Sequence, residues 1–210
     1  MHPLLSAARL YGIVDLGYVR SADAPAMTRA LCEGGVDLLQ LRAKGLAEAA
    51  VESLARELLP VTRDLGVPFI LNDHVAVAAT VGSQGVHVGQ DDDAVACARA
   101  AVGPDIFIGK STHSLAQAEA AQAEGADYLG FGPLYATDTK PDYVPIGLGG
   151  IAAVHARVTA PVFCIGGVNA SRLDAILAAG ARRVVVVSAF LQATDPRTAV
   201  RELKARLPSP

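Results

Sequence analysis

The sequence predicts an α/β fold, a single-domain (β/α)8 TIM barrel, and three observations favour it. Eight short β-rich runs alternate with alanine-rich segments of helical length within 210 residues. The β-rich runs are apolar almost throughout, which is typical of strands in a sheet that helices cover. Three helix-like segments end in glycine directly before a strand, at Gly35, Gly125 and Gly180, which is the usual return connection of a βα unit.

The predicted strands follow one another along the whole chain. They are residues 11–15, 36–42, 68–73, 85–89, 106–111, 128–133, 161–167 and 183–190. Apolar residues at helical spacing predict helices between them, most clearly in residues 47–66, 95–101, 114–125 and 147–158. No linker or low-complexity segment divides the chain, so we expect one domain over residues 1–210.

A doubly wound open sheet is the alternative, because it shows the same alternation of strands and helices. Such sheets usually have about five to seven strands, and those that bind dinucleotides carry a glycine-rich fingerprint after the first strand. Residues 13–19, IVDLGYV, do not match that fingerprint. We therefore favour the barrel.

The composition of the chain argues against nucleic acid and membranes as partners. Hydrophobic residues make up 51% of the chain, yet Gly, Pro or charged residues interrupt each apolar run before it is long enough to span a membrane. A net charge of −3 offers no basic surface for nucleic acid. The first residues lack a secretion signal, and the three cysteines show no metal-like spacing. We expect a cytoplasmic protein with no nucleic-acid or membrane partner, and the sequence leaves open whether it forms a homo-oligomer.

Polar residues recur at the carboxyl ends of the predicted strands, where barrels of this class carry their active sites. They are, strand by strand from the second, Gln40, Arg42 and Lys44; Asn72 and Asp73; Asp91, Asp92 and Asp93; Lys110, Ser111, Thr112 and His113; Thr137, Thr139 and Lys140; Gly166 and Gly167; and Ser188. The amino ends are much less polar. Repetition at one end indicates a binding site rather than a series of unrelated solvated loops.

These residue types suit phosphorylated ligands. Arg42, Lys44 and Lys140 offer positive charge to phosphate oxygens. Asp73 and one of the later aspartates offer the hard oxygen ligands that Mg²⁺ prefers. A glycine pair after the seventh strand and a serine after the eighth resemble the phosphate cradle that many barrels build there. No Ser or Cys lies near a convincing base, which favours loss of a leaving group over covalent catalysis.

Several of these residues also have a purely structural interpretation. The three aspartates could cap the helix that follows them, and Ser111 or Ser114 could cap the next one. The glycine pair could form only a tight turn. His87 is more typical of a packed core histidine than of a metal ligand, because no second histidine lies at ligand spacing, whereas His74 and His113 are more open candidates.

With these motifs the sequence resembles the thiamine phosphate synthase family over nearly its whole length. The resemblance rests on the order and spacing of QLRAK at 40–44, ND at 72–73, GVHVGQDD at 85–92, GKSTHS at 109–114, GPLYATDTKPD at 132–142, IGGV at 165–168 and VVSA at 186–189. The resemblance implies a (β/α)8 barrel that uses Mg²⁺ to join hydroxymethylpyrimidine diphosphate to hydroxyethylthiazole phosphate, with release of pyrophosphate. Small-molecule substrates are thus the implied partners.

The resemblance also implies roles for individual residues. It assigns to the pyrimidine diphosphate Gln40, Arg42, Lys44, Asn72, Ser111 and Lys140, with Arg42, Lys44, Ser111 and Lys140 as the catalytic set. It assigns to Mg²⁺ Asp73 and Asp92. It assigns to the thiazole phosphate Thr137, Thr139, Gly167, Val187 and Ser188. Neighbouring positions expected to contact substrate are Leu41, Ala43 and Asp138.

Two other functions are compatible with such a barrel. The thiazole tautomerases share it, but as a group they lack the aspartate of GQxD and carry TxCK, whereas this chain has GQDD at 89–92 and TDTK at 137–140. A non-catalytic barrel that binds phosphorylated thiamine precursors would bind ligand without turnover. The residues favour the synthase.

Overall fold

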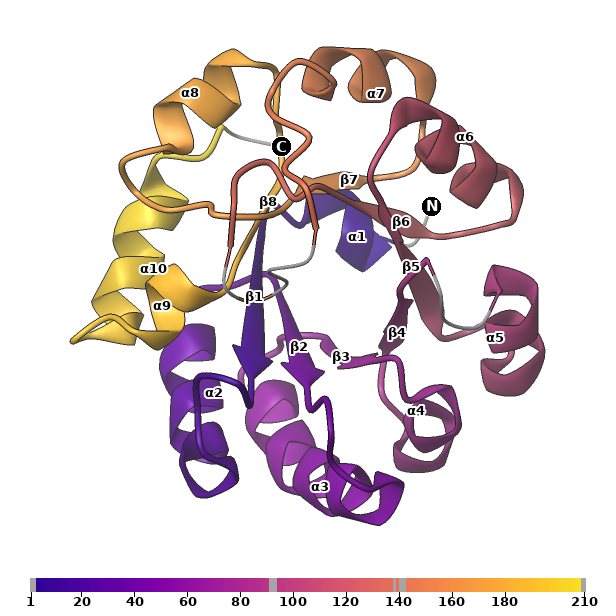
Figure 1. The fold of residues 1–210 in the computed structure, drawn as a ribbon. Helices are drawn as coiled ribbons and strands as arrows, with labels where there is room; N and C mark the ends of the chain where they lie inside the picture. The colour runs from indigo at the N-terminus through magenta and orange to yellow at the C-terminus, as the bar shows by residue number, and fades with distance from the viewer. Residues whose placement is uncertain (1–2, 91–93, 138, 140–142, 209–210) are drawn as a thin grey trace.

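The computed structural model describes residues 3–90, 94–137, 139 and 143–208. It contains a closed barrel of eight parallel strands in the order β1 to β8, with β8 paired to β1. Most of the helices surround the barrel on its outside (Figure 1). This arrangement confirms the predicted (β/α)8 barrel.

Each strand overlaps the run predicted for it, and the helices lie between the strands. The strands are β1 (Leu10–Asp15), β2 (Leu38–Arg42), β3 (Phe69–Asn72), β4 (Gly85–Val88), β5 (Phe107–Thr112), β6 (Tyr128–Phe131), β7 (Val162–Cys164) and β8 (Val184–Val186). The helices are α1 (Pro3–Ala7), the 3-10 turn η1 (Ser21–Asp23), α2 (Ala24–Gly34), α3 (Glu48–Asp64), α4 (Val75–Val81), α5 (Val95–Val102), α6 (Leu115–Ala123), α7 (Ile151–Arg157), α8 (Leu173–Ala178), α9 (Ser188–Leu191) and α10 (Pro196–Ala205).

The last two strands are shorter than predicted. β8 ends at Val186, and the residues from Ser188 onward form the short helix α9, so the predicted strand is wrong at its carboxyl end. β7 ends at Cys164, and Gly166 and Gly167 then turn the chain with φ angles of 101° and 64°. Glycine adopts such angles without steric cost. The chain therefore continues as a glycine turn after β7 and as the start of a helix after β8, with their backbone amides, rather than as extended strand.

Two apolar layers hold the barrel together. Outward-facing side chains such as Val14 and Leu39 pack in one large cluster with the helices. Inward-facing side chains such as Tyr11 and Phe163 form a second cluster inside the barrel, which includes Leu5 of α1. Successive side chains of a strand point to opposite faces, so each strand contributes to both layers. This alternation decides which residues can reach the interior.

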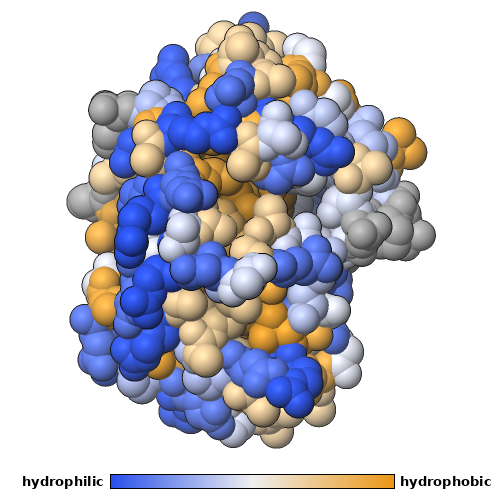
Figure 2. Space-filling view, turned by 90° about the vertical axis from the view of Figure 1, so that its left-hand side faces the viewer, coloured by the Kyte–Doolittle hydropathy of each residue, from blue (hydrophilic) through white to orange (hydrophobic). Residues whose placement is uncertain are grey.

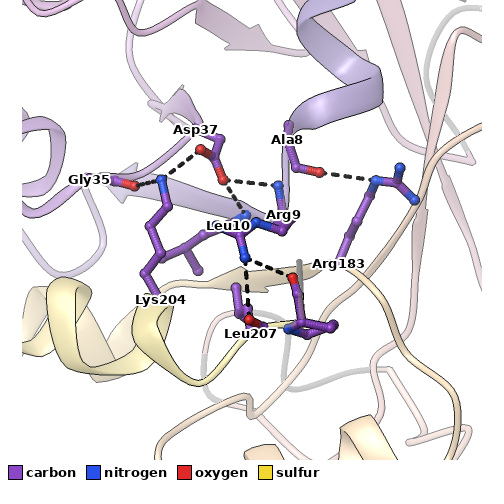
Figure 3. A network of polar contacts seen from close by, with 9 residues as sticks. Ala8, Arg9, Leu10, Gly35, Asp37, Arg183, Lys204 and Leu207 are labelled. Atoms are coloured by element: carbon purple, nitrogen blue, oxygen red, sulfur yellow. Dashed lines mark hydrogen bonds and ion pairs between the residues drawn. The ribbon is translucent and has the colours of Figure 1, made fainter. Parts of the chain in front are cut away.

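A polar network joins the elements at the amino end of the barrel (Figure 3). Asp37, just before β2, accepts the backbone N–H groups of Arg9 and Leu10 through Oδ2, each at 2.9 Å. Its Oδ1 lies 2.7 Å from Nζ of Lys204 on α10. Arg183, just before β8, donates from Nε to a backbone carbonyl of the segment that precedes β1, at 3.0 Å. Polar groups at this end thus tie the starts of β1, β2 and β8 together, a structural role.

The described surface carries few large apolar side chains. The exposed ones are Leu4, Leu65 and Val144. Figure 2 shows the side that carries α8 and α10, where hydrophilic residues lie among small apolar patches. Within the described residues, no helix combines the length and the hydropathy needed to cross a membrane.

Candidate active site

A cavity opens at the carboxyl ends of the strands. Its lining includes most of the residues predicted for substrate: Gln40, Arg42, Asn72, Ser111, Thr137, Thr139, Gly167, Val187 and Ser188. Segments far apart in the sequence thus contribute to one site. The structure brings together the residues expected for both substrates.

The remaining predicted residues fall into three groups. Leu41 and Ala43 are buried in the outer apolar layer, because they alternate with Gln40 and Arg42 along the chain. Their side chains face the helices, so only their backbone is placed to meet a ligand. Lys44 and Asp73 form a pair beside the cavity. The predictions for Asp92, Asp138 and Lys140 fall outside the described residues.

Arg42 is held by a carboxylate that the sequence analysis did not select. Its Nη1 lies 2.8 Å from Oδ2 of Asp15, its register partner on β1. The other carboxylate oxygen of Asp15 accepts the backbone N–H of Gly17 at 2.9 Å, which orients the acid. The Nε of Arg42 is buried and has no hydrogen-bond partner among the described residues. A buried donor of this kind is suited to an anionic ligand, because a buried N–H group without a hydrogen bond costs free energy.

Lys44 and Asp73 place opposite charges where β2 and β3 end. Nζ of Lys44 lies 3.2 Å from Oδ2 of Asp73. Asp73 has a φ of 65°, which is uncommon for a residue other than glycine. Its backbone N–H donates to the carbonyl of His87 at 2.8 Å, so the turn is anchored to β4.

Asp73 fits the expected Mg²⁺ in its chemistry. Mg²⁺ in enzymes usually takes one or two carboxylates and completes its shell with water and substrate phosphates. Within the described ranges, no three His, Cys, Asp or Glu side chains cluster as a ready-made metal site. A single described carboxylate is compatible with an ion whose shell is completed by water and substrate phosphates.

The turn after β7 approaches its neighbours too closely for a side chain. A Cβ on Gly167 would lie 2.6 Å from Nη1 of Arg172 and 2.8 Å from Cβ of Tyr135. Nη1 of Arg172 donates to the carbonyl of Gly167 at 2.9 Å, and its guanidinium stacks 4.5 Å from the centre of the Tyr135 ring. The glycine pair is thus a tight turn. Gly167 and Ser188 also line a second, more open pocket that contains Arg172.

The threonines of the TDTK motif lie at the mouth of the cavity. The backbone N–H of Thr139 donates to Oγ1 of Thr137 at 3.3 Å. Oγ1 of Thr139 lies 3.1 Å from Oη of Tyr18, in the segment after β1. Thr137 lines both pockets. These two threonines therefore lie where the site of the glycine turn meets the deeper cavity.

A chain of polar groups inside the barrel was not among the predicted site residues as a unit. Oη of Tyr11 lies 2.9 Å from Oε1 of Gln40 and 3.0 Å from Oη of Tyr128. Nδ1 of His87 lies 3.0 Å from Oη of Tyr128, and its Nε2 lies 3.0 Å from Oγ of Ser111. The expectation that no serine lies near a base is therefore wrong for Ser111. Burial is the main cause that raises the pKa of both phenols, so both keep their protons. Inward-facing tyrosines on two predicted strands were the available signal.

His87 and the other polar candidates have definite places. The His87 ring packs against Tyr128, with centroids 5.4 Å apart, as expected of a core histidine, but it also lines the cavity. His113 lines the cavity too, and Nδ1 of His113 contacts the carbonyl of Gly132. Ser114 caps α6 by accepting the N–H of Gln117 at 3.2 Å.

The other capping alternatives stand differently. Ser111 belongs to β5 and does not cap a helix, so it is available to the cavity. Ala94 is the N-cap residue of α5, and the capping role suggested for residues 91–93 lies outside the described residues.

Comparison with known proteins gives the family of the chain. The family model for thiamine monophosphate synthase matches residues 10–190. Thiamine-phosphate synthases of Chloroflexus aurantiacus and Herpetosiphon aurantiacus are 43% and 42% identical over 198 residues, covering 94% of this chain and 91% and 95% of theirs. The solved structure of thiamine phosphate pyrophosphorylase from Pyrococcus furiosus superposes with a TM-score of 0.86 at 32% identity, covering 96% of each chain. The chain belongs to the thiamine monophosphate synthase family.

Proposed function

We propose that the cavity at the carboxyl end of the barrel is where this chain joins a pyrimidine diphosphate to a thiazole phosphate. The chain is a transferase of thiamine biosynthesis, by its family membership. The substrates are 4-amino-2-methyl-5-(diphosphooxymethyl)pyrimidine and hydroxyethylthiazole phosphate, and the products are thiamine monophosphate and pyrophosphate. One observation carries the placement: residues predicted for the two substrates line a single cavity.

The pyrimidine ring occupies the deep part of the cavity in this proposal. Gln40 and Ser111 are the polar side chains there that belong to the predicted pyrimidine set, and both line the cavity with Asn72. The diphosphate lies toward Arg42 and Lys44, whose charges sit at the end of β2. The buried Nε of Arg42 supports this orientation, because a phosphate oxygen would satisfy it.

The thiazole phosphate lies at the opposite side of the mouth. Thr137, Gly167 and Ser188 line both pockets there, so hydroxyl groups and turn amides can surround one phosphate. Arg172 adds positive charge to the same place. This position directs the thiazole nitrogen toward the deeper ring. Orientation of two reactants in this way supplies much of the rate of a bimolecular step.

The chemistry is loss of a leaving group followed by capture. The amino group of the pyrimidine pushes electron density toward the exocyclic methylene, so the C–O bond to diphosphate breaks early and leaves a stabilised cation. Arg42, Lys44 and Lys140 stabilise the negative charge that grows on pyrophosphate. Mg²⁺, held by Asp73 and Asp92, would contribute further positive charge to the same oxygens. The thiazole nitrogen then captures the cation.

The proposed partners and setting follow from the same residues. The substrates are small molecules, and the net charge of −3 and the short apolar runs of the sequence favour neither nucleic acid nor a membrane. A cytoplasmic location is supported by the three free cysteines, Cys32, Cys97 and Cys164. We further propose that residues 1–210 act as one domain, whether alone or as a homo-oligomer.

The decisive experiment incubates the purified chain with both phosphorylated substrates and Mg²⁺. We expect thiamine monophosphate and pyrophosphate in equal amounts, detected by chromatography. Binding of both substrates without product would indicate a non-catalytic barrel. Conversion of a thiazole phosphate tautomer without coupling would indicate a tautomerase. Either result would overturn the proposal.

A further inference from the structure

In the polar chain inside the barrel, each of the three central groups has one proton for its two hydrogen bonds. Its order is Gln40, Tyr11, Tyr128, His87 and Ser111, and its four hydrogen bonds are 2.9, 3.0, 3.0 and 3.0 Å long. A phenol carries one proton, and a neutral imidazole carries one N–H. Each of the three central groups therefore donates one of its two bonds and accepts the other.

The direction of one bond therefore determines the direction of all the others. In the structure Tyr11 donates to Oε1 of Gln40. Tyr128 must then donate to Tyr11, and His87 must donate from Nδ1 to Tyr128. Ser111 must donate to the bare Nε2 of His87. This leaves the amide nitrogen of Gln40 as a donor for the cavity and the oxygen of Ser111 as an acceptor.

Turning the Gln40 amide around reverses the whole chain. The amide nitrogen then donates to Tyr11, and each of the following groups donates to the next, so that Nε2–H of His87 donates to Ser111. Gln40 now presents its carbonyl oxygen to the cavity, and Ser111 presents its proton. Other arrangements leave a buried donor or acceptor without a partner, which costs more than the bond is worth. The raised pKa of both phenols supports this, since neither is free to ionise instead.

We propose that Gln40, Tyr11, Tyr128, His87 and Ser111 form one proton-ordered relay that makes the two ends of the pocket complementary in hydrogen bonding. When Gln40 presents a donor to the cavity, Ser111 presents an acceptor. When Gln40 presents an acceptor, Ser111 presents a donor. The pocket thus accepts a heterocycle with one donor and one acceptor and discriminates against a ring with two acceptors. Tyr11, Tyr128 and His87 are positioning residues in this scheme. The identity of the ring, an aminopyrimidine, rests on the proposed function, whereas the relay itself does not.

The relay is tested in the ligand-free protein by the tautomer of His87. ¹⁵N chemical shifts distinguish a protonated from a bare ring nitrogen, and the variant His87→Asn identifies the signals among the five histidines. In Gln40→Glu the carboxylate can only accept, so Tyr11 must donate to it. We expect the Nδ1–H form of His87 at pH 8. In Gln40→Glu/Tyr11→Phe, Tyr128 loses its acceptor and turns its proton to Nδ1, so His87 becomes the Nε2–H form.

Among the described residues, the hydrogen bonds of the Tyr11 hydroxyl run to Gln40 and Tyr128 and not to His87. A change of tautomer would therefore have to pass through Tyr128. The matched control is Gln40→Glu/Tyr18→Phe, which removes a phenol outside the relay and should keep the Nδ1–H form. The same tautomer in Gln40→Glu and Gln40→Glu/Tyr11→Phe would overturn the relay.

Ligand selectivity gives a second measurement. The probes are 4-amino-5-hydroxymethyl-2-methylpyrimidine and its 4-methoxy analogue, which has two acceptors in place of a donor and an acceptor. We expect the intact chain to prefer the amino compound, and Tyr11→Phe to reduce this preference about tenfold, because the two ends can then donate independently. An unchanged preference would overturn the selectivity role.

The two measurements also separate this inference from the proposed function. If His87 responds to Tyr11 but neither pyrimidine binds, the relay stands and the proposed substrate fails. If thiamine monophosphate is formed but Tyr11→Phe does not change the tautomer of His87, the relay fails and the proposed function stands.

Discussion

Arg42 and Asp15 form a nearly buried ion pair at the carboxyl ends of β2 and β1. Nη1 of Arg42 lies 2.8 Å from Oδ2 of Asp15, and the two side chains are 14% and 2% exposed. The carboxylate therefore directs the guanidinium, and Nε of Arg42, which has no partner among the described residues, remains for a ligand. An arginine that is already oriented loses less freedom when an anion binds.

The first prediction tests this orientation. Asp15→Asn keeps the shape of the side chain but removes its charge, so Arg42 loses its anchor and its charge is left unpaired in a buried place. We expect kcat/KM to fall by about tenfold to a hundredfold, mainly through KM for the pyrimidine diphosphate, and the free energy of unfolding to fall by about 1–3 kcal/mol.

The matched control is Asp23→Asn, which breaks an exposed pair with Arg20. Exposed pairs contribute little, so this variant should behave like the unaltered protein. Steady-state kinetics and thermal unfolding measure both effects. Normal kinetics in Asp15→Asn would mean that Arg42 does not need the carboxylate to bind its ligand.

The second prediction concerns the metal. Asp73→Ala and Asp92→Ala should each lower kcat/KM by about two to four decades, because a metal that stabilises a leaving group is lost. They should also weaken binding of Mn²⁺ in the presence of pyrophosphate, measured by electron paramagnetic resonance. Circular dichroism should show an unchanged fold. Near-normal activity of Asp92→Ala at limiting Mg²⁺ would remove Asp92 from the metal site.

The third prediction separates the two phosphate sites. Thr139→Ala should raise KM for the thiazole phosphate about tenfold, as expected for one lost charge-assisted hydrogen bond of about 1.5 kcal/mol. KM for the pyrimidine diphosphate should change little. Thr80→Ala is the control, since Thr80 is exposed and its hydroxyl bonds only within α4. Equal effects on the KM values of both substrates would show that Thr139 does not bind the thiazole phosphate specifically.

The fourth prediction is a pH dependence of stability. The pKa of His155 on α7 is lowered from 6.5 to about 4, first by burial and then by the charges of Arg182 and Arg183. As pH falls from 6.5 toward 4, His155 therefore becomes protonated in the unfolded chain while it stays neutral in the folded chain. The contribution of neutral His155 to the free energy of unfolding is fully present above pH 6.5 and is lost as pH falls through this range.

For a side chain that is only partly buried we expect this loss to be about 1–2 kcal/mol. His155→Gln should remove it, so that its unfolding midpoint in denaturant shifts less between pH 7.5 and pH 4.5 than that of the unaltered chain. Equal shifts in the two proteins would show that His155 does not cause the dependence.

The fold could be predicted because its signals are local. Alternating periodicity and glycine-ended helices mark each βα unit, and the apolar strands require a covered sheet. The end of β8 could not be predicted, since Ser188 continues an apolar run in the sequence but begins a helix in the structure. Short apolar runs do not distinguish strand from buried helix.

The site could be predicted in part, and the missing part depends on register. Gln40 and Arg42 share a face by simple alternation. The pairing of Asp15 with Arg42 requires the register of β1 against β2. The contacts of Tyr11 and His87 with Tyr128 require, in addition, that the barrel close. Side chains that meet only across a closed barrel leave no spacing signal in one sequence.

The fifth prediction concerns Lys140, in the motif whose Thr139 is bound to Tyr18. If Lys140 stabilises pyrophosphate as the C–O bond breaks, its contribution is larger in the transition state than in the ground state. Lys140→Met keeps the stem and removes the charge, so the single-turnover rate should fall more than the affinity for pyrimidine diphosphate. An electron-withdrawing substituent on the pyrimidine should slow the same step, because it destabilises the cation.

The matched control is Lys204→Met, the same substitution at the amino end, where Lys204 pairs with Asp37. It should lower the unfolding midpoint and leave the single-turnover rate unchanged. Weakened binding with an unchanged rate in Lys140→Met would reduce Lys140 to a residue that only docks the substrate. Unchanged binding together with an unchanged rate would remove it from the site, and the charge on pyrophosphate would then have to be stabilised by Arg42 and Lys44, whose positions at the end of β2 are already held by Asp15 and Asp73.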